Sequence, residues 1–174
     1  MQIPEKINRF NVYVGDVTDD NKIQGITDEV TLPDFSYMSE TISYSGMAGE
    51  VDSPSPGQLQ SATIEITFAN ISKQGMSMVA DDSKKITMRA AQEVTDSDTL
   101  AVSFVNRTIE IKGRTKSINF GRLKKGGFGN PSITKEVIYY KDTLNEEELT
   151  EIDKYNGKCK INGADVVANI DNLI

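Results

Sequence analysis

The stretch Ser39–Phe68 reads SETISYSGMAGEVDSPSPGQLQSATIEITF and organises the interpretation of the whole chain. Its two ends alternate polar and apolar residues as β-strands do, whereas its middle, Ser45–Gln58, holds three glycines and two prolines. Proline lacks a ladder donor and glycine loses much entropy on ordering, so this middle does not pack a core alone. Connections of this length in compact domains are usually functional or disordered. We interpret it as a long arm ordered by a neighbouring subunit, with a mobile surface loop as the alternative.

The sequence on either side of the arm predicts a β-rich domain. After the arm, the alternate residues of the range 62–68 are apolar, the clearest period-two pattern in the chain. Similar patterns predict strands in the ranges 10–14, 26–32, 39–43, 85–94, 100–104, 109–111, 118–120 and 133–139. Ser72 is predicted to cap a short helix that ends near Asp81.

The last third of the chain contains a second glycine-rich segment and two tight turns. The range 121–132 is predicted to be a flexible hairpin loop, and Asn156-Gly157 and Asn162-Gly163 are strong turn dipeptides. The range 145–153 fits a helix by its glutamates and a strand by the residues that follow them. Asp165 can cap a final helix. The chain 1–174 is therefore expected to be one mainly β domain, a sandwich or barrel, with one packed short helix and a possible C-terminal helix.

Composition limits the function. The chain has 174 residues, a net charge of −7 and a pI near 4.7, so it lacks the basic excess of a dedicated nucleic-acid binder. Its single cysteine, Cys159, allows no intrachain disulfide and is expected to be buried and inert. The first residues show no signal peptide, and no run approaches the roughly 20 apolar residues that span a bilayer, so we expect synthesis in the cytoplasm.

The sequence offers no set of catalytic residues. It contains no histidine, which removes the commonest general base and an ordinary zinc site. The neighbouring carboxylates at 19–20, 81–82 and 146–148 are better explained as solvated turns or helix starts than as acid–base pairs. The glycines after Lys124-Lys125 lack the Gly-Lys-Ser/Thr order of a phosphate loop. We therefore predict no enzyme activity, no cofactor and no metal.

The chain resembles the major tail tube protein family of contractile-tailed bacteriophages and R-type phage-tail-like bacteriocins. The resemblance begins at IPEKINRFNVYV (3–14) and is most specific in SETIS…GMAGEVDSPSPGQ. It resumes at GRLKKGGFGNPSITKEVIYYK (121–141) and closes on LTEIDKYNGKCKINGADVVANI (149–170). The chain departs from the family in its missing Trp and in the segment DTLNEEE (142–148).

The resemblance implies six copies in a ring that closes a shared inner β-barrel, and rings that stack into a hollow tube. The implied partners are other copies of the chain, the tail sheath protein, baseplate and terminator proteins, and a tape measure protein or DNA in the lumen. No specific nucleic-acid binding is implied. The arm, 44–58, would contact an adjacent subunit or ring through Tyr44, Gly46, Met47, Gly49, Glu50, Val51, Asp52, Pro54, Pro56 and Gly57.

The resemblance implies a passive conduit that sheath contraction drives through a bacterial envelope, located in a virion tail or in a released bacteriocin. Two alternatives stay open: a bacteriocin tube with no DNA cargo, and a monomeric β-sandwich binding module. The basic groups at 112–116 and 122–125 are either solvated surface or one half of charge-complementary contacts with acidic segments of another copy.

Overall fold

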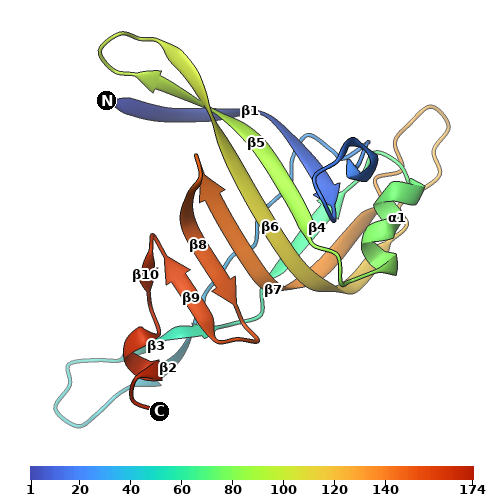
Figure 1. The fold of residues 1–174 in the computed structure, drawn as a ribbon. Helices are drawn as coiled ribbons and strands as arrows, with labels where there is room; N and C mark the ends of the chain where they lie inside the picture. The colour runs from blue at the N-terminus through green and yellow to red at the C-terminus, as the bar shows by residue number, and fades with distance from the viewer.

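The alternating apolar residues line the inner face of a single antiparallel sheet. A computed structural model describes residues 1–174 (Figure 1). Its elements are β1 (Gln2–Val14), a 3₁₀ turn (Asp19–Asn21), β2 (Tyr37–Ile42), β3 (Val51–Leu59), β4 (Thr63–Thr67), α1 (Lys73–Ala80), β5 (Ile86–Asp96), β6 (Val102–Asn119), β7 (Ser132–Leu144), β8 (Glu147–Asp153), β9 (Lys158–Ile161), β10 (Ala164–Asp165) and α2 (Ala168–Asp171).

Eight strands form one antiparallel sheet in the order β1-β5-β6-β7-β8-β9-β10, and β4 pairs with the first half of β7. β7 therefore changes partner along its length, from β4 to β8. The segment 22–33 spans the gap between the two edges of this curled sheet. It bridges β1 at Tyr13–Lys22 and β4 at Ile26–Phe68 and Thr31–Glu65. The sheet and this segment together form a barrel-like wall. The wall is closed beside the C-terminal end of β1, at Tyr13, and open along the rest of that strand.

The core fills the concave side of the sheet. The most buried side chains come from its central strands and from α1. They include Ile64, Ile66, Met78, Ile86, Ile111 and Val137. The covering segment contributes Ile26, Val30, Leu32 and Phe35, which pack against this cluster. Burying such side chains contributes about 1.5–3 kcal/mol each, so the wall and its cover are stabilised as one unit.

Helix α1 begins and ends where the sequence predicts. The hydroxyl of Ser72 accepts a hydrogen bond of 2.9 Å from the Gly75 N–H. Gly75 is buried close to the ring of Phe68, which explains why a poor helix former stands there. α1 has eight residues and α2 has four, so neither helix is long enough to cross a membrane.

The mainly β prediction, with one packed helix and a C-terminal helix, is confirmed; two local predictions differ from the structure, and one range that was left open is now assigned. The predicted strand 26–32 is wrong: the segment meets β4 only at two isolated bridges. Its polar centre, Thr27-Asp28-Glu29, interrupts the alternation that a strand needs. The range 145–153, left open between helix and strand, is the strand β8 after a two-residue turn. Asn145 and Glu146 adopt φ values of 48° and 69° there, as a tight hairpin turn requires.

The second difference concerns the end of the chain. Asp165 was expected to cap the last helix, but it lies in β10 and α2 begins at Ala168. The Asp165 carboxylate instead accepts a 3.0 Å hydrogen bond from the Val167 N–H. Val167 is buried, because the glycine turn at 162–163 returns this segment to the sheet.

Candidate assembly surfaces

The predicted arm is the outer part of a two-stranded hairpin that stands apart from the main sheet. β2 and β3 pair only with each other, and residues 43–50 form the turn between them (Figure 1). The second half of the predicted connection is thus a strand, even though it contains Pro54 and Pro56. Pro54 lies opposite Ser39, and the register then shifts before Leu59 pairs with Tyr37. The prolines are tolerated because they lie beside this irregularity on a strand with only one partner.

The base of the hairpin is fixed to the body of the domain. The Gln60 N–H donates to the Ser36 carbonyl at 2.9 Å, and the Lys154 ammonium donates to the Gln60 carbonyl at 2.9 Å. Phe35 packs edge-on against Tyr140, with ring centroids 5.2 Å apart. Cys159 is buried beside Tyr37, and burial raises the pKa of its thiol. The hairpin therefore leaves the domain in a defined direction.

Gly57 belongs to this base. Its φ is 77°, and a Cβ at this position would overlap the side chain of Val167. The structure thus gives Gly57 a contact inside its own subunit, close to the C-terminal segment. The glycines of the turn differ, because Gly46 and Gly49 have φ values of 96° and 140° and open space around them. They are needed for the shape of the turn.

The remaining predicted residues lie together at the exposed end of the hairpin. Tyr44 is 70% exposed, Val51 55% and Met47 40%, which are high values for apolar side chains. Glu50 and Asp52 are exposed beside them, and Asp52 accepts a 2.8 Å hydrogen bond from the Thr41 hydroxyl across the hairpin. We call residues 44–52 the arm tip. It combines an apolar group with two carboxylates that form no ion pair within the chain.

The range 120–131 connects β6 to β7 and lies at the opposite end of the molecule from the arm tip (Figure 1). We call it the β6–β7 loop. Arg122, Lys124 and Lys125 are exposed in it, and so are Leu123 and Phe128. The loop is held at its root, where the Gly129 N–H donates to the Ala69 carbonyl at 3.0 Å and the Arg122 N–H donates to the Gly129 carbonyl at 3.0 Å.

Sequence reasoning missed a third surface. The first half of β1 and the β5–β6 hairpin extend beyond the core as a three-stranded blade (Figure 1). Ile3, Leu100, Val102 and Phe104 are 45–75% exposed on it. The alternation of the range 100–104 was visible in the sequence and was interpreted only as a strand with a core face. The signal that could have revealed the blade is the 18-residue length of β6, which exceeds what the core can cover.

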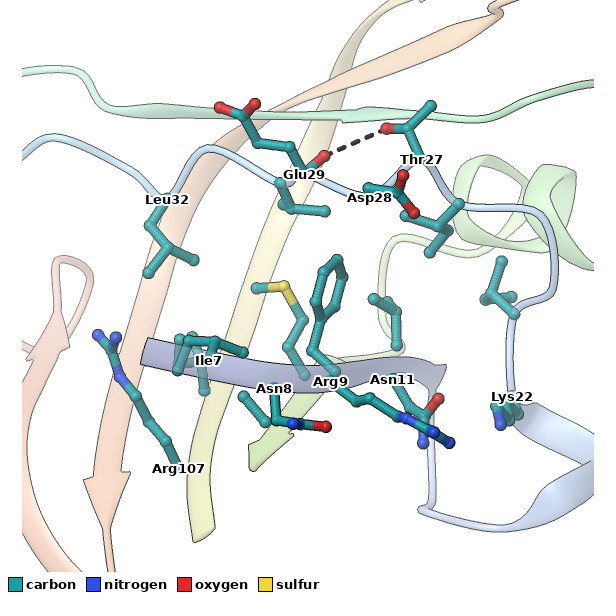
Figure 2. A pocket seen from close by; sticks show the side chains of 18 of the residues that line it. Ile7, Asn8, Arg9, Asn11, Lys22, Thr27, Asp28, Glu29, Leu32 and Arg107 are labelled. Carbon is teal, nitrogen blue, oxygen red and sulfur yellow. Dashed lines mark hydrogen bonds between the residues drawn. The ribbon is translucent and has the colours of Figure 1, made fainter. Parts of the chain in front are cut away.

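A groove of about 680 Å³ runs along the open part of β1 (Figure 2). It lies where the segment 24–32 moves away from β1, so it is the opening in the barrel-like wall. Phe10, Met88 and Ile109 contribute apolar lining, and Arg9 and Glu29 contribute polar groups. From Gln2 to Asn11, β1 has a partner strand on one side only, so the main-chain N–H and C=O groups on its other side have no ladder partner, and residues 7–11 of this free edge border the groove.

Buried charges in the domain serve packing. The ammonium of Lys135, whose side chain is 3% exposed, donates to Asp82 at 2.6 Å and to the Thr115 hydroxyl at 3.2 Å. The hydrogen bonds from Lys135 and Thr115 lower the pKa of Asp82 to about 2. This cluster ties the end of α1 to β6 and β7. No group of three or more His, Cys, Asp or Glu side chains lies together as metal ligands would.

The curled, open sheet, the projecting hairpin and the exposed apolar surfaces define a structural β protein with several surfaces suited to contacts between subunits. Residues 4–174 match the model of the family Phage tail tube protein FII, and the chain belongs to that family. The resemblance drawn from the sequence is confirmed: the chain is a structural tail tube protein rather than an enzyme, and its place is in the virion tail.

The relatives agree with this membership. The chain is 26% identical over 172 residues to the tail tube protein of Escherichia phage P2, covering 95% of this chain and 94% of the relative. Two solved structures share the fold at 18% identity. One is the sheath/tube terminator of an extracellular contractile injection system in its extended state, with a TM-score of 0.53 and coverage of 81% of this chain and 97% of the other. The other is the sheath–tube complex of such a system in its extended state, with a TM-score of 0.50 and coverage of 78% and 88%.

Proposed function

We propose that this chain assembles into hexameric rings that stack into the hollow inner tube of a contractile tail. The observation that carries the proposal is the open wall of the subunit. β1 presents an unpaired edge along most of its 13 residues, and the blade beside it exposes large apolar side chains. Free edges and apolar patches of this kind are avoided in monomers, because they promote association. Closing six such sheets into one barrel removes the edges.

In this proposal the tube is a passive conduit that sheath contraction drives through a bacterial envelope. The partners are further copies of the chain, the sheath protein, the terminator and baseplate proteins, and a tape measure protein or DNA in the lumen. The sheath and terminator are supported by the fold shared with the sheath–tube complex and terminator of the injection system. A net charge of −7 per copy makes the tube acidic, and acidic side chains lining the lumen would let DNA or protein pass by repulsion without adhering.

Negative-stain electron microscopy of the purified chain tests the proposal. We expect rings with six-fold symmetry and long hollow tubes. A monodisperse species of 19.2 kDa under all conditions of salt and concentration would refute it. Family membership already disfavours the monomeric binding module that the sequence left open.

The arm is tested by deletion. Removing residues 47–56 eliminates most of the arm tip and the start of β3, while the anchoring contacts of Gln60 with Ser36 and Lys154 remain. We expect a folded, soluble subunit that forms no tubes, because the deleted residues include Met47 and Val51, two of the three exposed apolar side chains of the tip, and both of its carboxylates. Tubes of normal length from this variant would show that the arm is not an assembly element.

A further inference from the structure

The main sheet has a polar face on the side away from its core. Successive side chains of a strand point to opposite faces, and β5–β9 bury the side chains of Ile86, Ile111, Tyr140, Ile152 and Cys159 in the core. The residues next to these in sequence therefore lie on the other face, opposite α1 and the covering segment. We call this the ladder face.

The register of the strands arranges the ladder face in three adjacent rows. The rows are Arg89, Thr108, Thr143 and Glu148; Thr87, Glu110, Lys141, Glu151 and Lys160; and Lys112, Tyr139, Asp153 and Lys158, with Lys85 at the start of β5.

Positive and negative side chains alternate along the middle row. Glu110 lies opposite Lys141, and Lys141 lies opposite Glu151 on its other side. Glu151 in turn lies opposite Lys160. Opposite charges at directly paired positions stabilise neighbouring strands, so this row supports the sheet as well as giving the face its charge.

The carboxylates of the ladder face hold its ammonium groups. Three ion pairs join neighbouring side chains: Lys85 with Glu110, Lys141 with Glu148 at 3.1 Å, and Lys158 with Glu151 at 2.7 Å. The hydrogen bond from Lys158 lowers the pKa of Glu151, so this carboxylate stays ionised. Lysines held in this way are less available to an external anion.

The ladder face has a net charge opposite in sign to that of the chain. Its three rows and Lys85 contain six basic and four acidic side chains, a net charge of +2, whereas the whole chain has −7. The acidic excess of the chain therefore lies on other surfaces. A basic excess attracts a polyanion, and the ion pairs within the face weaken that attraction.

Ring closure through the edge of β1 determines where the ladder face points. β1 and β5–β9 belong to one sheet, so a barrel that six copies share through β1 is built from the strands that carry the ladder face (Figure 1). The other side of these strands is filled by the core, α1 and the covering segment. Only the ladder face is free to border an open channel.

We propose that the ladder face lines the channel of the tube and meets the phosphate backbone of duplex DNA, with its carboxylates holding its lysines so that DNA passes without being retained. The proposal rests on the proposed tube assembly and specifies the wall of its channel and the ligand. Phosphates have to compete with Glu110, Glu148 and Glu151 for the lysines, so each contact is weak and transient. On this face, engaged lysines take the place of repulsion by a uniformly acidic lining.

Freeing the lysines tests the electrostatic part of the proposal in the unassembled full chain. The triple variant Glu110→Gln, Glu148→Gln and Glu151→Gln removes the three paired carboxylates and keeps the size of the side chains. Below the concentration at which tubes form, we expect it to bind closed circular duplex DNA at least about tenfold more tightly than a matched control at low salt. The slope of log affinity against log salt should be steeper by roughly 3, about one for each freed lysine.

The matched control has the same change in net charge at another exposed site. Asp16→Asn, Asp19→Asn and Asp20→Asn alter three exposed carboxylates that form no ion pair. This control is expected to bind DNA within about twofold of wild type. Gel shifts over a range of salt concentrations measure the affinities, and circular dichroism confirms that each variant is folded.

Assembly tests where the ladder face lies. A closed circle cannot be threaded into a tube from its end, so sedimented tubes of the triple variant are expected to carry no more circular DNA than wild-type tubes. Independently, Thr143→Cys places a thiol on the ladder face, and the native Cys159 is buried. A small maleimide is expected to label this thiol in subunits and in tubes, whereas a maleimide attached to a large protein should label it in subunits only.

The outcomes are distinct. Tighter DNA binding by triple-variant subunits, its loss on assembly and size-selective labelling of Thr143→Cys tubes support the proposal. A gain below tenfold over the control, circular DNA that sediments with triple-variant tubes, or Thr143→Cys tubes labelled by both reagents or by neither would overturn it. A wild-type chain that forms neither rings nor tubes would refute the proposed function instead.

Discussion

Removing the carboxylate of Asp82 tests whether the cluster under α1 stabilises the subunit. In Asp82→Ala, the ammonium of Lys135 keeps only one hydrogen-bond partner, the Thr115 hydroxyl at 3.2 Å. The Lys135 side chain is only 3% exposed in the folded subunit. The Thr115 N–H, which donates to Asp82 at 3.1 Å, also loses its acceptor. A buried charge that has lost its partner destabilises a fold far more than the replacement of both charges by apolar side chains does.

The magnitude follows from burial. Breaking a fully buried ion pair by removing one partner costs roughly 3–5 kcal/mol. Asp82 is 37% exposed, so water reaches part of the vacated site, and we expect a loss of about 2–3 kcal/mol. Lys135→Met is expected to cost less, about 1 kcal/mol, because Asp82 keeps water and its bonds to Thr115. The double variant removes both charges, so it is expected to recover at least about 1 kcal/mol relative to Asp82→Ala.

Urea denaturation followed by circular dichroism, below the concentration at which tubes form, measures these differences. Asp20→Ala is the matched control, since this exposed carboxylate forms no ion pair; it is expected to change stability by less than about 0.5 kcal/mol. The reasoning is refuted if Asp82→Ala behaves like the control, or if the double variant is no more stable than Asp82→Ala.

The pKa of Asp82 is lowered from 3.8 to about 2, so its stabilising effect is present above pH 3.8 and is lost as the pH falls through about 2. Acid titration of stability should therefore show a decline in that window that is smaller in Asp82→Asn. Gly57→Leu forces a side chain into Val167 at a φ of 77°, and we expect a loss of about 1–3 kcal/mol in thermal or urea unfolding, whereas Gly46→Ala, with open space around it, costs less. Ser72→Ala removes the 2.9 Å cap on Gly75 and is expected to lower the free energy of unfolding by about 1 kcal/mol, while Ser72→Thr retains most of it. Equal stability of Ser72→Ala and wild type would contradict the capping role.

Local patterns predicted the elements whose partners are nearby or whose burial is one-sided. The range 62–68 alternates because β4 has one face in the core, and Ile64 and Ile66 are each 1% exposed. The dipeptide Asn162-Gly163 predicted its turn because both residues adopt the positive φ that the hairpin requires. Ser72 predicted the start of α1 because a cap acts within three residues.

The errors lie where a distant partner decides the structure. β3 forms in spite of its prolines because β2, separated from it by the turn 43–50, supplies a ladder. The glutamates of β8 favour a helix, but pairing with β7 on one side and β9 on the other overrides their propensity. The range 26–32 has strand-like composition, yet β4 offers it only two bridging positions. No local pattern contains this information.

The assembly surfaces were also predictable only where local sequence decides the structure. Glycines and prolines marked the hairpin, and the structure exposes its tip as expected, but the role of Gly57 depends on Val167, more than a hundred residues further along the chain. The blade was missed because its residues alternate like a core strand. Only the fold shows that the core ends before Phe104.

The same fold explains why the subunit can be stable and still incomplete. The core gathers at one end of the long strands, under the covering segment and α1, so it does not depend on the exposed halves of β1, β5 and β6. Those halves keep an apolar face and an unpaired edge, which another subunit can complete. The acidic hairpin and the basic loop lie apart from this edge. Under the proposed function, closing a ring would use the free edge and not the core, so substitutions on the edge are expected to impair assembly and to leave the subunit folded.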